Sequence, residues 1–508
     1  LSDFNLAKGT TNFTLNGGRN EYAIMGWFYR AAYDYKGKYL AEVNGRYDGT
    51  SRFPRGKRYG FFPSFSAAYR ISEEAFFEPL RKTVDNLKIR LSYGSLGNQQ
   101  IGYYDFIQTI TTKGSMGDYS FDGTILGQHA TVSDPVSGNQ TWEKVISKNL
   151  GADLNMFSNR LSLTADFYIR DTKGILGKGK SLPSIYGANE PQVNSNNLRT
   201  KGYELVLGWR DSFKLAGSTF SYGITGTFSD YTAEYTKCDN PSGLIGGPYV
   251  GKKYGEIWGY KVDGLFRNDE EAAEYASRVD LSKVAAGYYS ATGAYGKGVR
   301  GGDIKYLDLD GSGIVDGGKG TLEDPGDRRV IGNSSPRYQY GLTLNLSWYG
   351  FDLSVFMQGI GRLDWYPGAD NLRFWGPYSR PYATFIPKNF MSQVWSESNP
   401  DAYLPRARAY TSLNSTQGTA YYTNDRYLQN LAYCRLKNLT LGYTIPKRLT
   451  SKVGIKECRV YFSGENLATW SALKNDFLDP EQAAADSDKK SNVYPWCRTY
   501  SVGLNLTF

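Results

Sequence analysis

One short segment carries oxygen-bearing residues at the spacing of a calcium-binding loop. They occupy positions 1, 3, 5, 7 and 9 of an EF-hand-type loop, in which position 7 contributes its backbone carbonyl. These residues are Asp308, Asp310, Ser312, Ile314 and Asp316. Because Ca²⁺ prefers several hard oxygen ligands, the spacing predicts a structural cation at this loop.

The end of the loop departs from the calcium pattern. Position 12 is Lys319 rather than a bidentate Glu, so we expect weaker binding unless a nearby carboxylate contributes. The nearby candidates are Glu323, Asp324 and Asp327. The alternative is a metal-free turn in which the Asp side chains accept hydrogen bonds from backbone N–H groups.

Catalytic chemistry has little support in this sequence. His129 is the only histidine and no nucleophile motif surrounds it, which argues against a His-dependent triad or a two-histidine metal site. The glycine-rich segment 246–253 lacks the Ser or Thr that holds Mg²⁺ in a phosphate-binding loop. We therefore expect no enzymatic activity and no organic cofactor.

The composition limits the classes of protein further. Mean hydropathy is −0.50, and no run of about 18 apolar residues could form a membrane-spanning helix. The net charge of +9 is dispersed among acidic residues, which argues against a nucleic-acid partner. The cysteines show no CxxC spacing, so we expect isolated thiols, with one disulfide as the alternative. They are Cys238, Cys434, Cys458 and Cys497.

The elements that must position these residues are β-strands. Apolar and polar residues alternate with period 2, most clearly over 160–171, so one face of each strand meets apolar surroundings and the other meets water. The high content of 42 Tyr suits the interface girdles of a membrane barrel. We expect thirteen strands, at 21–35, 38–50, 58–73, 85–97, 142–157, 159–176, 198–212, 217–236, 335–349, 351–363, 426–446, 455–470 and 497–508.

The connections between these strands alternate in length. Every second one is short, whereas the others, except 51–57, are long loops such as 98–141 and 177–197. Outer-membrane barrels have tight periplasmic turns and long extracellular loops. We therefore predict an all-β fold, a transmembrane antiparallel β-barrel. In it, 237–334 forms a long extracellular loop with a short helix from Asn268 to about Val279, and 364–425 forms another.

The last predicted strand ends in a terminal aromatic residue after alternating apolar positions. This pattern looks like the signal by which the barrel-assembly machinery recognises its clients. The residues that carry it are Tyr500, Val502, Gly503, Leu504, Leu506 and Phe508.

Six segments resemble the SusC/RagA family of TonB-dependent outer-membrane transporters. The first resembles the family's strand and loop ending in DGSSRF, and the third and fourth its GDIKYxD and IGNSxP blocks. They are 38–53, 87–98, 302–313, 327–336, 349–359 and 435–443. Because they follow one another in order, the resemblance covers nearly the whole chain.

The resemblance implies a protein of the Gram-negative outer membrane with a periplasmic C-terminus. It implies a 22-stranded barrel around an N-terminal plug, lidded by a SusD-like surface lipoprotein and driven through the TonB complex. The transported substrate would be an oligomeric nutrient, either glycan or peptide. A passive porin, an adhesin or, with less support, a barrel hydrolase are the alternatives.

Two further expectations follow from the resemblance. Thirteen of 22 strands leave nine, so we expect residues 1–508 to be the C-terminal part of one barrel that a missing N-terminal barrel and plug segment completes. Aromatic residues of the loop 364–425 could stack on sugars or grip a peptide, although loop packing or contact with the lipoprotein would also account for them. These residues are Trp365, Tyr366, Phe374, Trp375 and Tyr378.

Overall fold

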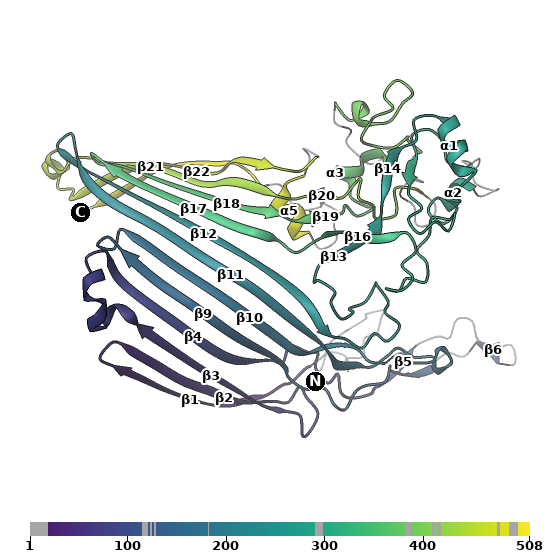
Figure 1. The fold of residues 1–508 in the computed structure, drawn as a ribbon, viewed down its shortest axis with the longest axis horizontal. Coiled ribbons are helices and arrows are strands. Elements are labelled where there is room, and N and C mark those ends of the chain that lie inside the picture. The colour runs from purple at the N-terminus through teal and green to yellow at the C-terminus, as the bar shows by residue number, and fades with distance from the viewer. Residues whose placement is uncertain are drawn as a thin grey trace, which may run out of the picture.

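A single antiparallel sheet of thirteen strands dominates the chain (Figure 1). The computed structural model describes residues 19–113, 120–121, 124–125, 129–180, 182–289, 298–380, 386, 388–408, 413, 418–474, 478–486 and 496–508. The sheet strands, in order, are β1 (Ile24–Tyr35), β2 (Tyr39–Thr50), β3 (Tyr59–Arg70), β4 (Val84–Asn98), β9 (Glu143–Met156), β10 (Leu161–Lys178), β11 (Gln192–Leu215), β12 (Ser218–Lys237), β17 (Arg337–Trp348), β18 (Phe351–Arg362), β21 (Tyr433–Thr444), β22 (Glu457–Ser471) and β23 (Thr499–Thr507). Each pairs only with its neighbours in this order.

The predicted all-β fold class and all thirteen predicted strands are confirmed. The largest difference lies at 426–446, where the structure has a short β20 (Gln429–Asn430) followed by β21. Tyr427 and Leu431 are fully buried in the core of the loops, so this part of the chain leaves the sheet. In the part of the chain that the structure describes, no helix is long and apolar enough to span a membrane.

The alternation of side chains gives the sheet two different faces. Leu163 on β10 lies opposite Leu154 on β9 and Leu207 on β11. We name this side the apolar face; across β12, β17, β18 and β21 it continues as Ile224, Leu344, Val355 and Leu439. The opposite side, the polar face, carries the charged residues described below. This difference is expected of a sheet with lipid on one side and water on the other.

Two bands of aromatic side chains border the apolar face. The band near the long loops, the loop-end band, comprises Trp27, Tyr47, Tyr59, Phe167, Tyr203, Phe228 and Tyr338. The centroids of rings in contact within it are 5.4 to 6.4 Å apart. The band near the short connections, the turn-end band, comprises Tyr35, Tyr39, Tyr69, Phe213, Phe220, Tyr222, Phe351 and Tyr443. Tyr39 and Tyr47 lie eight residues apart on β2, roughly 26 Å along the strand. At the tilt of about 35–45° usual for such barrels, this spacing corresponds to a height of roughly 20 Å, somewhat less than the usual apolar band of about 25 Å.

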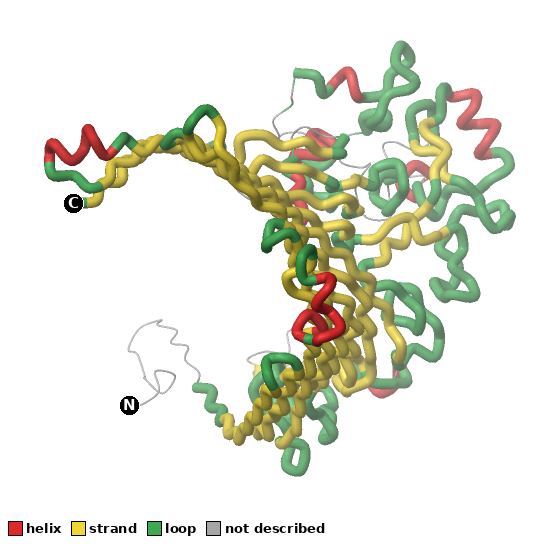
Figure 2. Tube along the Cα trace, turned by 60° about the vertical axis from the view of Figure 1, so that its left-hand side comes forward, coloured by secondary structure: helices red, strands yellow, loops and turns green. Residues whose placement is uncertain are grey.

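The sheet is an open arc in the described part of the chain. Figure 2 shows the strands forming a curved sheet that does not close on itself, and its end strands are β1 and β23. β1 pairs with β2 and β23 with β22, and these two end strands do not pair with each other. Each therefore presents one edge of backbone N–H and C=O groups without a strand partner among the described residues.

The two longest loops fold together at one end of the sheet (Figure 1). We name the described residues of 238–336 and 363–432 the loop body. Their apolar side chains share one core that extends from Tyr260 to Leu431 and includes Leu478 of the last loop. Its elements are β13 (Glu256–Tyr260), β14 (Val262–Leu265), α1 (Asp269–Ala276), α2 (Ala286–Tyr289), β15 (Ile304–Tyr306), β16 (Arg328–Asn333), β19 (Asp364–Trp365), α3 (Leu372–Trp375), two 3₁₀ helices (Gly376–Tyr378, Met391–Gln393) and β20.

The helix predicted from Asn268 is confirmed, although it ends at Ala276 rather than near Val279. The Asn268 side chain accepts a 2.8 Å hydrogen bond from the Glu271 N–H, as expected of an N-cap. The remaining elements are short: β5 (Ile110–Lys113), β6 (Ser120–Phe121), β7 (Thr124–Ile125), β8 (His129–Val132), α4 (Lys447–Thr450), α5 (Pro480–Ala485) and 3₁₀ helices at Ile71–Glu73, Ala75–Leu80, Ser184–Tyr186 and Ser451–Val453.

Candidate functional site

The polar face of the sheet is held by ion pairs that cross neighbouring strands. Arg90 on β4 donates two hydrogen bonds to Asp153 on β9, at 2.9 and 3.1 Å, and two to Asp166 on β10, at 3.0 and 3.1 Å. The guanidinium thus bridges two carboxylates in bidentate fashion, which fixes its orientation. All three side chains are partly exposed, so the network forms a charged wall in which one guanidinium meets two carboxylates.

Glycine on the intervening strand makes room for such pairs. Gly151 of β9 lies between Arg90 and Asp166 in register, and a Cβ there would come within 2.7 Å of the guanidinium carbon. The same arrangement recurs at Gly442 on β21, over which Arg459 donates a 2.9 Å hydrogen bond to Asp352. A larger residue at either glycine would displace the ion pair. The sequence alone did not reveal these networks, because they depend on strand register.

The last long loop also attaches to this wall. Arg435 of β21 is 1% exposed and donates a 2.9 Å hydrogen bond to Glu481 of α5, while its other terminal nitrogen contacts Asp479. Lys437 donates to both oxygens of Glu481, at 2.8 and 2.7 Å. These contacts hold the loop against the sheet. The polar face therefore offers fixed donors and acceptors for hydrated polar solutes.

The predicted calcium loop has a different ligand set from the one that the spacing suggests. Carboxylate oxygens of Asp308, Asp310 and Asp327 lie within 4.8 Å of one another. Asp316 instead accepts a 2.7 Å hydrogen bond from the Gly318 N–H. Asp327, one of the three neighbours considered for the missing ligand, thus joins the first two positions, and Asp316 does not.

Backbone N–H groups already satisfy much of this cluster. Asp308 accepts hydrogen bonds from the N–H groups of Gly311 and Gly313, at 2.8 and 2.9 Å. The buried Asp327 accepts from Leu309 and Asp316, at 2.6 and 2.9 Å. Burial raises the pKa of Asp327, whereas hydrogen bonds from Ser312 lower that of Asp310. The loop can therefore hold its shape without a cation, and Ca²⁺ binding stays a prediction.

A chelator tests this prediction directly. If Ca²⁺ bridges the carboxylates, removing it should increase proteolysis of the segment 308–327 in the wild type. The double variant Asp308→Ala/Asp310→Ala should be sensitive with or without chelator, because both lost side chains also hold the turn. Glu323→Ala removes an exposed acid from the same segment and should still respond to chelation. Wild-type digestion that is unchanged by chelator would exclude the cation.

The five aromatic residues proposed to contact substrate are brought together, but inside the loop body. Trp365, Tyr366, Phe374, Trp375 and Tyr378 are between 0% and 8% exposed and belong to its core. The Phe374 and Trp375 rings are 4.7 Å apart in an edge-to-face arrangement. Their placement favours loop packing over stacking on a ligand.

The residues of the predicted barrel-assembly signal lie on the end strand β23, except Phe508, which directly follows it. Tyr500, Val502, Leu504, Leu506 and Phe508 are all between 41% and 79% exposed. They extend the apolar face, since Val502 lies opposite Phe462 and Leu504 opposite Val460. Gly503 belongs to the alternate set of residues, and the Tyr461 ring covers it on the polar face. Recognition by assembly machinery stays a prediction.

Two other predicted sites can be placed. Cys238, Cys434 and Cys458 form no disulfide in the part of the chain that the structure describes, which agrees with the prediction of isolated thiols. His129 lies on β8, where it pairs in register with Lys113. Among the described residues, the one group of three or more metal-ligating side chains that could share an ion is the Asp308, Asp310 and Asp327 cluster.

Comparison with known proteins agrees with this architecture. The family model described as "TonB dependent receptor-like, beta-barrel" matches residues 1–467. TonB-dependent receptor P3 of Formosa agariphila is 27% identical over 527 residues, which cover 99% of this chain and 47% of that protein. TonB-dependent receptor SusC of Bacteroides thetaiotaomicron is 23% identical over 500 residues, covering 96% of this chain and 44% of SusC.

The solved structure of the RagAB peptide transporter has the same fold. It matches with a TM-score of 0.72 at 21% sequence identity, over 99% of this chain and 50% of that one. The chain thus spans about half the length of the relatives it matches. The family match, together with SusC and RagAB, confirms the resemblance found in the sequence. The chain belongs to the TonB-dependent receptor β-barrel family, and within it resembles the SusC/RagA transporters.

Proposed function

We propose that this chain forms part of the wall of an outer-membrane importer for oligomeric nutrients, driven through TonB. The observation that carries the proposal is the pairing of an apolar outer face with a polar face of fixed ion pairs, in a chain of the TonB-dependent receptor family. An apolar face suits lipid, and a polar face suits an aqueous path. The loop body would form part of the outer opening.

The cargo that fits this wall is a polar oligomer of sugar or amino-acid units. Arg90 and Arg459 are each paired with carboxylates, so neither guanidinium is left as an unpaired cation, and the wall suits water and polar groups. No covalent step is proposed. A SusD-like lipoprotein over the opening and the TonB complex are the partners that the family resemblance supports.

Uptake of labelled oligomers by living cells tests the proposal. Cells that express the full-length protein should take up either oligosaccharides or oligopeptides, and deletion of its gene should abolish that uptake. A protonophore should stop uptake as well, because TonB draws on the proton gradient of the inner membrane. A small solute that enters through porins serves as the control and should cross the outer membrane in all cases.

The uptake experiment and two assays of the purified protein separate the alternatives. Uptake that persists after the proton gradient collapses would indicate a passive pore and contradict the proposal. Shortened oligomers released by the purified protein would indicate a hydrolase instead. Co-purification of a surface lipoprotein with the tagged protein would support the SusD-like partner, and a lone protein from undisturbed membranes would count against it.

A further inference from the structure

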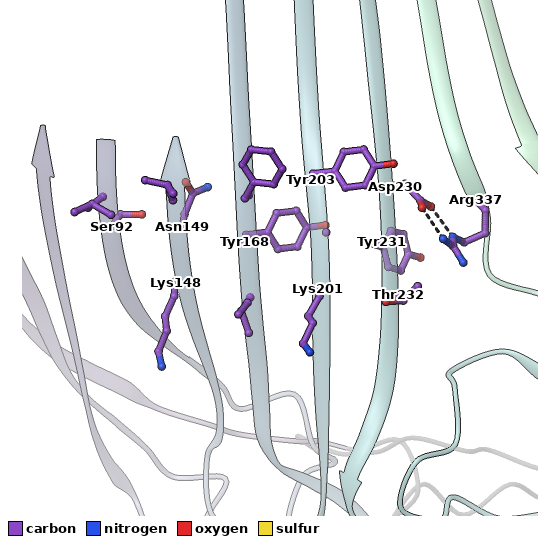
Figure 3. A pocket seen from close by; sticks show the side chains of 15 residues that line it. Ser92, Lys148, Asn149, Tyr168, Lys201, Tyr203, Asp230, Tyr231, Thr232 and Arg337 are labelled. Atoms are coloured by element: carbon purple, nitrogen blue, oxygen red, sulfur yellow. Dashed lines mark hydrogen bonds and ion pairs between the residues drawn. The ribbon is translucent and has the colours of Figure 1, made fainter. Parts of the chain in front are cut away.

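Lysines interrupt the apolar face just beyond the loop-end band. Phe167 of β10 lies opposite Leu150 of β9 and Tyr203 of β11. Two residues nearer the loops, Ile169 lies opposite Lys148 and Lys201. Because side chains alternate along a strand, these lysines share a face with the aromatic residues, and they lie nearer to the long loops. Both lysines are exposed, and Figure 3 shows their side chains extending in the same direction, toward the loop ends of the strands.

Three more lysines continue this row toward the loops. Lys173 lies opposite Lys144, and both fall on the same face by even spacing from Ile169 and Lys148. Asn197 of β11 lies opposite Lys173 and Lys237. These lysines are also exposed. We name this set the lysine patch: Lys144, Lys148, Lys173, Lys201 and Lys237.

The acidic residues around the patch are already engaged. Asp171 accepts a 2.7 Å hydrogen bond from Arg199. Glu234 pairs with Lys253, and Asp230 pairs with Arg337, as the dashed lines in Figure 3 mark for the latter. No lysine of the patch forms an ion pair within the part of the chain that the structure describes. Glu234 also interacts electrostatically with Lys201. The three carboxylates each already pair with another cation, so the five lysines of the patch keep an excess of positive charge.

We propose that the lysine patch binds the phosphate groups of an anionic lipid in the membrane leaflet at the loop end. Its acyl chains would lie against Leu91, Leu150 and Phe167, which are exposed on the apolar face next to the lysines, on the side of the turn ends. A long Lys side chain can rest its methylenes on apolar surface while its ammonium group reaches the polar headgroup layer. A lipid alone matches both chemistries at these heights, since a soluble anion would not use the apolar row.

Binding of lipid A to the full-length protein in detergent tests this proposal by native mass spectrometry. Lys148→Gln/Lys201→Gln should bind lipid A about 30-fold more weakly, since each Lys near an anionic surface contributes about 1 kcal/mol and 1.4 kcal/mol is tenfold in affinity. The matched control is Lys36→Gln/Lys214→Gln, which removes the same charge at the turn end, where both lysines are exposed. It should bind as the wild type does.

A second arm identifies the recognised group. Lipid A from which the phosphates have been removed should bind wild type and Lys148→Gln/Lys201→Gln equally weakly. Inorganic phosphate at millimolar concentration should not displace the intact lipid. Equal affinity of the wild type for intact and dephosphorylated lipid would overturn the proposal. So would loss of a protein oligomer in the variant with lipid binding unchanged, because the patch would then be a protein interface.

Discussion

Replacing Arg408 with Met should destabilise the loop body by about 3–5 kcal/mol, because it leaves a buried carboxylate without its cation. Arg408 donates hydrogen bonds of 3.0 and 2.6 Å to the two oxygens of Asp303. The two side chains are 7% and 1% exposed. Arg408 also lies 4.2 Å from the centroid of the Tyr288 ring. Hydrogen exchange of the β15 amides in the full-length protein would measure the loss.

The size of this loss should depend on pH. Burial raises the pKa of Asp303 to about 6, above the value near 3.9 of an unfolded Asp. The stability that this group contributes is therefore fully present below about pH 4 and is lost as the pH rises through 6. Without Arg408, whose charge and hydrogen bonds lower the pKa, Asp303 should protonate at still higher pH. The variant should then be less impaired at pH 5 than at pH 7.5.

Two control variants make this prediction specific. Arg278→Met removes an exposed pair with Glu274 in the same loop body and should cost no more than about 0.5 kcal/mol. Adding Asp303→Asn to Arg408→Met should recover stability at pH 7.5, since it removes the unpaired charge. A loss that is equal at both pH values, or unchanged by the second substitution, would contradict the role of the buried charge.

A lysine at Leu163 should destabilise the membrane-embedded protein by about 2–4 kcal/mol, because this position lies between the two aromatic bands on the apolar face. Leu163 is four residues from Phe167 of the loop-end band, and Leu161 on its other side lies opposite Trp209. The same change at the neighbouring Thr164 should cost far less. Thr164 is on the polar face, where its hydroxyl donates to Asp153 at 3.3 Å.

Unfolding of the full-length protein from lipid bilayers would compare the two variants. Leu344 and Thr343 on β17 provide an independent pair, since Leu344 lies opposite Ile224 and Val355. If Leu→Lys and Thr→Lys cost the same at both places, the two faces of the sheet have been assigned wrongly.

The strands could be predicted from the sequence because their signal is local. In a strand such as 161–169, every second residue is apolar, and the backbone alone fixes that period. The ion-pair networks of the polar face could not be predicted in the same way. Arg90 meets Asp166 only because the connection at 157–160 sets the register of β9 and β10, and because Gly151 leaves space between them.

The loop residues were harder to interpret for a related reason. Irregular loops have no periodicity that separates an exposed ring from a buried one, so Trp375 and Tyr378 were candidates for ligand contact although both are buried. The spacing of the calcium motif predicts Asp316 as one of the ligands. The fold instead turns Asp327, eleven residues further on, toward Asp308 and Asp310. Local spacing cannot predict such a return of the chain.

The loop body is built from two connections between strands of the sheet, and this sets an order of assembly. Each of these connections links two strands that pair with each other, β12 with β17 and β18 with β21, so the sheet can form without a folded loop body. The loop body joins residues such as Asp303 and Arg408, 105 positions apart, with the β17–β18 hairpin between them. Its core can close only after both long loops have come together at one end of the sheet. We therefore expect the sheet to form before the loop body. If the loop body then failed to fold, the protein would be inserted in the membrane but inactive.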